Sequence, residues 1–327
     1  MISYEDVLSA QERISPYVCH TPLLRVEALD ETTGFITYVK PENLQPMGAF
    51  KLRGATNKIL SLTTEEKARG VITASSGNHG MAVSLAALKQ GIQAVIVLPE
   101  DVSAAKLKGI QDLGAKTVFC GHTSDERNDH MYILADKEGY TIVHAFEDSH
   151  VIAGQGTAAL EALSDEPELE AFVGPVGGGG FISGIATAAK GANTPRIVVG
   201  VEPMNLRRYA VSREAKEPKT LPRKPTITDG TRGISASLLN FPCIELCVDE
   251  LVAANDDAVK AAMFAYAKFM RLVVEPSGAL PLAAAIGKKL PSLNGKKVCL
   301  IISGGNCDFR DYTNWLLEGA DIFDSIS

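Results

Sequence analysis

The chain has 327 residues, enough for two α/β domains or one large unit, and its 46% hydrophobic and 22% charged content is typical of a soluble protein with a sizeable core. The net charge of −7 and the lack of a basic cluster argue against nucleic acid as a partner, and no apolar run is long enough to span a membrane. No signal-like segment opens the chain and its six cysteines form no CxxC pair, so we expect a cytoplasmic protein with free thiols.

The first half of the chain predicts short strands that alternate with helices. We expect a helix over 4–15, an extended segment over 21–24, a strand over 35–40 and a helix from Lys51 to Leu60. Further strands are expected over 71–74, 94–98, 115–120 and 141–144, and further helices over 77–90, 103–113 and 124–137. Strands without polar alternation, spaced by helices, are typical of a buried parallel sheet with right-handed crossovers.

A second alternating series follows. Its predicted strands cover 171–176, 196–202, 244–248 and 298–303, and its predicted helices cover 151–163, 181–190, 255–270 and 277–289. The polar, proline-containing stretch 204–228 reads as an irregular excursion. The two series predict an α/β fold of two doubly wound domains with mainly parallel sheets, and ligands are expected between them at the carboxyl ends of strands.

The stretch Gly48-Ala49-Phe50-Lys51-Leu52-Arg53-Gly54-Ala55 places a lysine at the start of a predicted helix. The helix dipole does not favour a cation there, so the position needs another explanation. Lysine loses its charge readily when desolvated and is the side chain that forms Schiff bases. A solvated surface lysine is the alternative that this stretch alone leaves open.

The run Ser75-Ser76-Gly77-Asn78-His79-Gly80 follows a predicted strand and opens a helix. Backbone amides in such a turn bind carboxylates, and the amide of Asn78 could reach a phenolic oxygen. An ordinary helix cap by Ser76 or Asn78 explains the same residues equally well.

The run Gly177-Gly178-Gly179-Gly180 lies between a predicted strand and a predicted helix, where backbone amides and the helix N-terminus favour a phosphate. A dinucleotide site is the competing interpretation, because Gly178 and Gly180 begin a GxGxxG pattern and Glu202 ends the next strand. That pattern fails at Ser183, where the third glycine or alanine is needed.

Ser303-Gly304-Gly305-Asn306 ends the last predicted strand, and its serine hydroxyl could meet a ring nitrogen; a simple strand-to-loop turn is the alternative. Taken together, the four motifs offer an amine, an asparagine amide, a phosphate-binding turn and a hydroxyl. These are the groups that a protein needs to bind pyridoxal phosphate.

With these motifs and Ala153-Gly154-Gln155-Gly156-Thr157 in order, the chain resembles the fold-type II (tryptophan synthase β-like) pyridoxal phosphate enzymes over nearly its full length. Within them it is most similar to the serine/threonine dehydratases, serine racemases and 3-hydroxyaspartate dehydratases. The resemblance implies a homodimer, and a small domain of residues 47–145 inserted into a large domain of residues 1–46 and 146–327.

The resemblance also assigns roles to single residues. It implies that Lys51 forms the Schiff base with the cofactor, that Phe50 packs against its ring and that Asn78 contacts its O3′. The four glycines would hold the phosphate, and Ser303 would face the ring nitrogen. The substrate carboxylate would lie on the amides around Ser75, Gly77, Asn78 and His79.

Three further positions bear on substrate and metal. Ser76 stands where many threonine dehydratases have alanine and where serine racemases have their second acid/base, so racemisation is possible. Members that bind a divalent cation use a glutamate, a carbonyl and an acidic residue; Glu202 matches the first, but Arg208 stands at the last. A guanidinium there could pair with Glu202 and replace the ion, so we expect activity without metal.

Arg127 aligns with an arginine near the substrate side chain in racemase-like members, where it could recognise a second carboxylate. The alternative is a solvated helix arginine beside Asp125 and Glu126.

The expected reaction is loss of water from a β-hydroxy amino acid such as serine, threonine or 3-hydroxyaspartate, which gives a 2-keto acid and ammonia. Lys51 would move the Cα proton, and the neutral Ser303 suits elimination or racemisation better than transamination. A serine racemase is the alternative within enzymes. A nicotinamide nucleotide oxidoreductase or a binding protein without catalysis is the alternative from another class.

Overall fold

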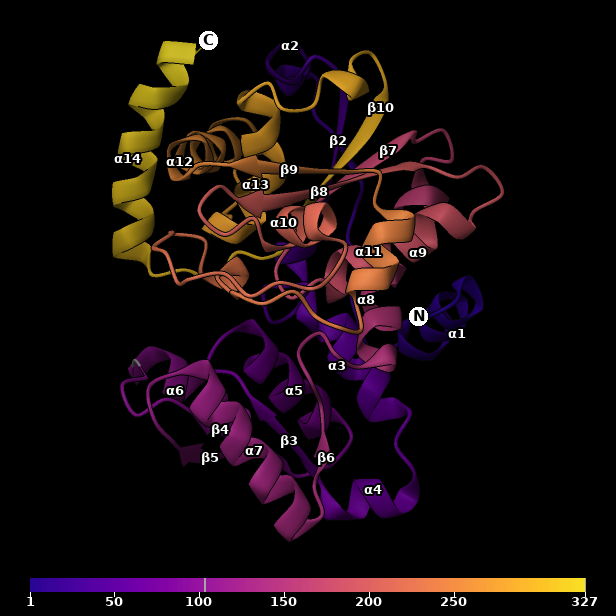
Figure 1. The fold of residues 1–327 in the computed structure, drawn as a ribbon, viewed down its shortest axis with the longest axis vertical. Helices are drawn as coiled ribbons and strands as arrows, with labels where there is room; N and C mark the ends of the chain where they lie inside the picture. Colours follow the sequence, from indigo (N-terminus) through magenta and orange to yellow (C-terminus); the bar gives the residue numbers. More distant parts are fainter. Residues whose placement is uncertain (103, 327) are drawn as a thin grey trace.

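The computed structural model describes residues 1–102 and 104–326, and it contains two β-sheets that lie one above the other (Figure 1). The six-stranded sheet, hereafter the large sheet, has the order β1-β2-β10-β7-β8-β9. The four-stranded sheet, hereafter the small sheet, has the order β5-β4-β3-β6. All pairs of neighbouring strands are parallel except β1 with β2, which confirms the predicted α/β fold with mainly parallel sheets.

The strands of the large sheet come from both ends of the chain. They are β1 (Leu24–Arg25), β2 (Ile36–Pro41), β7 (Ala171–Pro175), β8 (Ile197–Pro203), β9 (Glu250–Ala254) and β10 (Lys297–Ile302). In the central strand, Leu300 pairs with Val39 on one side and with Val173 on the other. The strand from the start of the chain therefore lies beside the strand from its end.

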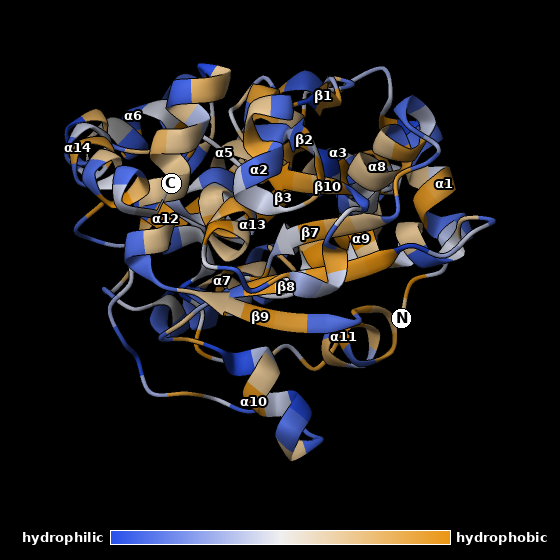
Figure 2. Cartoon of the chain, turned by 90° about the horizontal axis from the view of Figure 1, so that it is seen from above, coloured by the Kyte–Doolittle hydropathy of each residue, from blue (hydrophilic) through white to orange (hydrophobic). Residues whose placement is uncertain are grey.

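Side chains of the large sheet alternate between two hydrophobic cores, as period-two geometry requires. Val298, Leu300 and Ile302 face the core formed with α12 (Asp256–Ala265), α13 (Pro276–Ile286) and α14 (Phe309–Ile326), whereas Cys299 and Ile301 face the opposite core. That second core includes α8 (Ser149–Asp165), α9 (Gly180–Gly191) and α11 (Phe241–Cys247). Figure 2 shows the resulting hydrophobic colouring of β7, β8 and α9.

The small sheet has the same layered construction. Its strands are β3 (Val71–Ala74), β4 (Ala94–Leu98), β5 (Lys116–Phe119) and β6 (Thr141–Ile142), and its helices include α5 (Asn78–Lys89), α6 (Ala104–Asp112) and α7 (Ser124–Glu138). Ile96 packs toward α5, while Val95 and Val97 pack toward Met131 of α7. The predicted helix over 103–113 is confirmed from residue 104, and Ser103 lies outside the described residues. The boundaries of the two domains stay a prediction.

Helix α3 (Lys51–Leu60) joins the two sheets, because it packs against both α5 and α8. Gly54 and Gly154 allow a close approach between α3 and α8: a Cβ atom on Gly154 would lie 2.7 Å from the Cα of Gly54. The Gly-Gln-Gly motif of α8 therefore serves the packing of the lysine-bearing helix.

Two sequence predictions were wrong. Residues 244–248, predicted as a strand, lie mostly in α11, and the strand β9 follows at Glu250–Ala254. Pro242 is a helix-start signal that outweighs the strand propensity of the segment. The excursion over 204–228 contains α10 (Arg208–Ala215), whose first residue is a buried arginine.

The remaining helical elements lie outside the two sheets. They include α1 (Tyr4–Ile14), α2 (Asp30–Thr33), α4 (Thr64–Arg69), the π-helical turn Tyr266–Met270 after α12, and the 3-10 turn Asp229–Thr231. None of the helices in the described part of the chain combines the length and apolar content that a membrane-spanning helix requires.

Candidate active site

Lys51, the first residue of α3, follows a tight turn at Gly48, whose φ of +79° favours glycine. The backbone of this turn is attached to the end of β10, because the Phe50 N–H donates to the Ser303 carbonyl at 3.0 Å. The Lys51 Nζ donates to the carbonyl of Ala145 at 2.8 Å. Burial of the amine lowers the pKa of Lys51 to about 8, although the carboxylate of Glu275 acts in the opposite direction. The surface alternative is therefore wrong, and the amine is partly neutral near physiological pH.

A network of buried charges lies under the same helix. Arg53 donates to Glu42 at 2.6 Å and to Glu161 at 2.7 Å, and Lys40 donates to Glu161 at 2.7 Å. Burial by itself would raise the pKa of Glu42, but the charge and hydrogen bonds of Arg53 outweigh it, so that pKa is lowered. These charge-assisted hydrogen bonds hold α3 against β2 and α8.

The four-glycine run forms the turn between β7 and α9. Gly179 has a φ of +92°, and α9 begins at Gly180 without a side-chain cap, so the first amides of the helix are left for another acceptor. A Cβ atom on Gly178 would lie 2.3 Å from the ring of Phe146. The turn therefore requires glycine, and its free amides suit a phosphate.

The second predicted turn precedes α5. Gly77 is the residue before the helix, and its N–H donates to the Ser75 hydroxyl at 3.3 Å. Ser76 is half-buried at this helix N-terminus. His79 is buried, its Nε2 lies 2.8 Å from the carbonyl of Val143, and burial lowers its pKa to about 3. The His79 ring is therefore neutral and structural, so only its backbone amide remains a candidate for the substrate carboxylate.

Asn78 is hydrogen-bonded to two residues from the far end of the chain. Its Nδ2 donates to both carboxylate oxygens of Glu275, at 3.0 and 3.1 Å, and its Oδ1 accepts from Asn306 at 2.9 Å. Burial and, to a smaller extent, the charge of Asp229 together raise the pKa of Glu275 to about 8. Glu275 also lies close to Gly304, where a Cβ atom would be 2.6 Å from its Oε1.

Sequence analysis missed Glu275, although it left a signal. Glu275 is the only charged residue between Leu272 and Gly287, and it directly precedes Pro276, the first residue of α13. An isolated carboxyl in an apolar stretch is either paired or kept neutral, and both states are common at reactive sites.

The other predicted cofactor residues are close by but make contacts that sequence analysis did not foresee. Phe50 stacks on Phe181 with ring centroids 3.8 Å apart, and its own ring centroid is 5.0 Å from the Lys51 Nζ. Ser303 follows β10 and is 3% exposed. The roles that the resemblance gives to Phe50 and Ser303 stay predictions.

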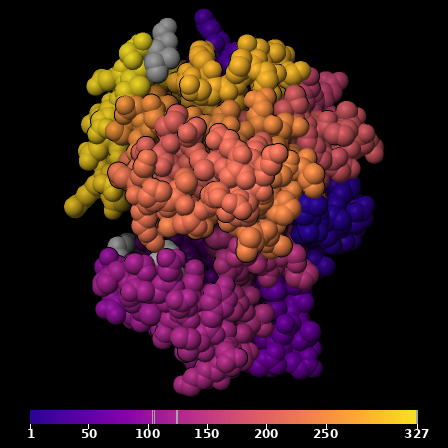
Figure 3. Space-filling view, in the orientation of Figure 1, coloured from indigo at the N-terminus to yellow at the C-terminus, as the bar shows by residue number. Residues whose placement is uncertain are grey.

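Arg127 is 8% exposed at the start of α7 and donates to the carbonyl of His122 at 3.3 Å, so the alternative of a solvated arginine is wrong. Burial and the charge of Arg232 lower its pKa. Figure 3 shows a furrow between the part of the molecule that contains α7 and the part formed by the large sheet, and the candidate site residues come from both.

Glu202 and Arg208 do not form the predicted ion pair. The two oxygens of Glu202 accept the backbone N–H groups of Tyr209 and Ala210, each at 2.9 Å, whereas Arg208 donates only to carbonyl oxygens. The carboxylate caps the start of α10 because that helix end offers unpaired amides. Both oxygens of Glu202 are thus used by backbone amides. The dinucleotide interpretation needs this carboxylate to bind a ribose, and it is not available for that role.

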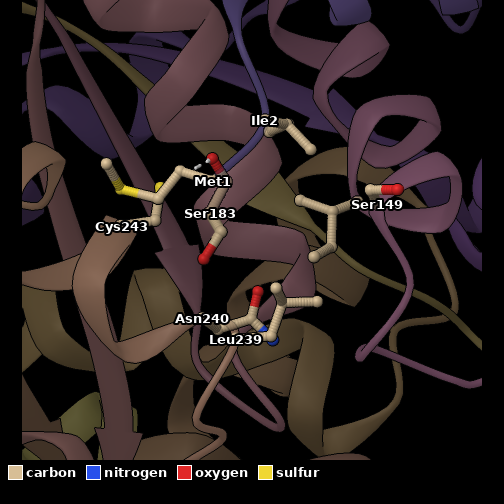
Figure 4. Close-up of a pocket in the computed structure, with 8 residues that line it drawn as sticks. Met1, Ile2, Ser149, Ser183, Leu239, Asn240 and Cys243 are labelled. Carbon is tan, nitrogen blue, oxygen red and sulfur yellow. Dashed lines mark hydrogen bonds between the residues drawn. The ribbon is translucent and has the colours of Figure 1, made fainter.

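A small cavity of about 70 Å³ lies near the glycine run, between α8, α9 and α11 (Figure 4). Met1, Ser183 and Cys243 line it together with Asn240, whose Nδ2 donates to the carbonyl of Gly178 at 3.2 Å. Lys51 and Glu275 do not line this cavity, so it is separate from the site that holds the reactive amine.

A buried amine, a glycine turn with free amides and a helix N-terminus, all at strand ends of two parallel sheets, define a class of enzyme that binds a phosphorylated aldehyde. Comparison with known proteins agrees, since residues 14–304 match the family model described as pyridoxal-phosphate dependent enzyme. The chain belongs to this family, and its cofactor is pyridoxal phosphate. The nicotinamide alternative is therefore rejected.

The similar proteins include both ammonia-lyases and serine racemases. The chain is 40% identical to an L-threonine ammonia-lyase of Thermotoga maritima, over 94% of this chain and 76% of that protein. It is 38% identical to a serine racemase of Dictyostelium discoideum, over 96% and 98% of the two chains. The structure of maize serine racemase superposes with a TM-score of 0.91 at 35% identity and covers 98% of both chains.

Proposed function

We propose that this protein is a lyase that removes water from a β-hydroxy amino acid and releases a 2-keto acid and ammonia. The observation that carries the proposal is the Lys51 amine, whose pKa is lowered to about 8 by burial. An amine with such a pKa is available both as a base and, once protonated, as an acid at physiological pH. The similarity to an L-threonine ammonia-lyase supports the same reaction.

The residues present fit the cofactor. Bound pyridoxal phosphate supplies an aldehyde for an amino group and an electron-withdrawing ring that weakens the Cα–H bond of the substrate. The free amides at Gly178, Gly179 and Gly180 would hold its phosphate, and the buried hydroxyl of Ser303 would meet its ring nitrogen as a neutral partner. Lys51 would then accept the Cα proton of the substrate.

The substrate carboxylate would lie on the amides of residues 75–79, where the N-terminus of α5 adds a positive potential. Asn78 would keep its side-chain orientation through Glu275 and Asn306. Arg127 is the candidate group for a second carboxylate, as in 3-hydroxyaspartate, because its side chain is buried and a guanidinium can bind a carboxylate through two hydrogen bonds.

The second candidate function is a serine racemase, which Ser76 and the similarity to serine racemases favour. Racemisation needs an acid and a base on opposite sides of Cα, and the Ser76 hydroxyl at the start of α5 would supply the second group. Chiral analysis of the amino acid that remains after incubation with L-serine separates the two functions.

The experiment that tests the proposal is a panel of serine, threonine, 3-hydroxyaspartate and a phenylserine, assayed for keto-acid release by the purified holoenzyme. We expect release from at least one member with loss of the hydroxyl. Interconversion of serine enantiomers without keto acid would reject the lyase. We also propose a cytoplasmic homodimer, which light scattering of the purified protein would test.

A further inference from the structure

Arg208 is a fully buried cation directly behind the glycine turn. It is 0% exposed, and its two terminal nitrogens donate to four backbone carbonyls rather than to any carboxylate. The acceptors are Leu206 at 3.2 Å, Thr231 at 3.1 Å, Val176 at 2.9 Å and Gly177. The charge of Glu202 acts on Arg208 from nearby, but no carboxylate accepts a hydrogen bond from the guanidinium. Burial of a guanidinium that donates only to carbonyls is costly, so this arrangement needs an explanation.

The contacts of Arg208 fix the direction of the amides in the turn. In a planar trans peptide the C=O and N–H groups point in opposite directions. Because the carbonyls of Val176 and Gly177 point toward the guanidinium, the N–H groups of Gly177 and Gly178 point away from it. Arg208 thereby directs these two donors to the opposite side of the turn.

The neighbouring residue continues the pattern. The hydroxyl of Tyr209 donates to the carbonyl of Gly178 at 2.8 Å, so the N–H of Gly179 also points away from α10. Glu202 fixes the start of α10 by accepting the amides of Tyr209 and Ala210. Figure 2 shows α10 beyond β9, outside the large sheet. Its first two residues, Arg208 and Tyr209, make the contacts with the glycine turn.

The same region is where the resemblance places a divalent cation in some members, and the residues present do not fit one. Both oxygens of Glu202 already accept amides, the carbonyl of Leu206 accepts from the guanidinium, and the third position carries a positive charge. Within the described part of the chain, each of these oxygens already accepts a hydrogen bond, and an inorganic cation would be repelled by Arg208.

We propose that Arg208 is a positioning residue that holds the glycine turn in its phosphate-binding conformation, and that its guanidinium takes the place of an inorganic cation. Four carbonyl acceptors at once need a planar group with several fixed donors, which a lysine cannot supply. The inference rests on the family's cofactor and not on the proposed substrate, so a wrong substrate would leave it intact.

The test compares Arg208→Lys and Arg208→Met with Arg213→Lys and Arg213→Met. Arg213 lies on the same helix but pairs with Glu245 at 2.7 Å, away from the glycine turn. We expect both Arg208 variants to raise the dissociation constant for pyridoxal phosphate by about 10- to 100-fold, the loss expected for charge-assisted hydrogen bonds. The ³¹P resonance of the bound phosphate should shift in the same variants, whereas the Arg213 variants should match the wild type.

A merely structural role would lower the thermal midpoint of the Arg208 variants without changing the dissociation constant or the ³¹P resonance, and that result would overturn the proposal. If Arg208→Met does not fold, Arg208→Lys still tests the positioning role, because lysine keeps the positive charge but lacks the planar set of donors.

The proposal that Arg208 replaces an inorganic cation is tested by treating the wild-type holoenzyme with EDTA and then with Mg²⁺. We expect neither the affinity for pyridoxal phosphate nor the thermal midpoint to change. A decrease of either property on chelation that Mg²⁺ restores would overturn the proposal.

Discussion

Two sets of ionisable side chains contact the start of α3, one around Arg53 and one around Lys51, and they behave differently. Under the helix, Arg53 is matched by Glu42 and Glu161 within hydrogen-bond distance, and the pKa of Glu42 is lowered in spite of burial. At the start of the helix, the pKa of Lys51 falls and that of Glu275 rises, each to about 8.

The difference teaches that close pairing, rather than burial alone, decides whether a buried group stays charged. In the matched set, Arg53 keeps the pKa of Glu42 low, and the set fixes the position of α3. The unmatched pair does not make direct contact, and each member changes its charge near pH 8, which is a property of reactive sites. Arg53 of the supporting network and Lys51 of the titratable pair are thus only two residues apart in α3.

The largest expected effect comes from removing the reactive amine. Lys51→Ala should lower turnover by a factor of about 10⁴ or more, because the same side chain anchors the cofactor and moves the proton. The measurement is keto-acid release, together with loss of the yellow band that borohydride reduction normally fixes to the protein. Lys58→Ala on the same helix is the control and should keep its activity; full activity of Lys51→Ala would falsify the site.

Breaking the matched set should affect stability rather than chemistry. Glu161→Gln leaves Lys40 and Arg53 with one carboxylate between them, and should lower the free energy of unfolding by about 3–5 kcal/mol. Urea denaturation of the holoenzyme measures this loss. Glu168→Gln, at an exposed ion pair, should change stability by no more than about 0.5 kcal/mol. Equal losses in the two variants would show that the buried network is not special.

The unmatched carboxyl gives a pH-dependent prediction. The folded-state pKa of Glu275 is raised from 4.5 to about 8, so its contribution to stability is complete below pH 4.5 and is lost as the pH rises toward 8. Glu275→Gln keeps a neutral acceptor for Asn78 and removes the decrease in stability that the wild type shows as the pH rises. The stability of the variant relative to the wild type should therefore increase with pH by up to about 1.4 kcal/mol per unit.

Thermal unfolding of both proteins between pH 5 and pH 8.5 measures that difference. Glu318→Gln, on the exposed side of α14, serves as the control and should show no trend. A flat difference for Glu275→Gln would mean that the wild-type carboxyl is ionised throughout the range.

The smallest expected effect concerns Ser76. Ser76→Ala should leave the elimination rate within a factor of about three, because Lys51 alone handles the Cα proton in that reaction. Any interconversion of serine enantiomers should disappear, because the second acid/base is gone. Chiral chromatography after incubation with L-serine is the measurement, and persistent racemisation would remove Ser76 from the mechanism.

Much of the fold could be predicted because its strands are short, uniformly apolar runs. β3 and β4 have the predicted bounds, and α3 begins and ends at the predicted residues. The strand prediction for residues 244–248 was wrong because a short apolar segment has no periodicity that distinguishes a strand from a helix. Helix α10 was not predicted because its sequence is mostly polar, although its first residue is buried.

By itself, the sequence determined the parallel α/β class and the four strand-end motifs, because uniformly apolar strands have a clear pattern and the four motifs together, though not singly, match one cofactor. Only the tertiary structure decided which groups share a contact. Asn78 and Glu275 are 197 residues apart in sequence, and Arg208 and Gly177 are 31 apart, yet each pair is hydrogen-bonded. The physical reason is that the protonation state of Glu275 and the direction of the glycine amides depend on desolvation and on partners brought from distant elements, which no local pattern encodes.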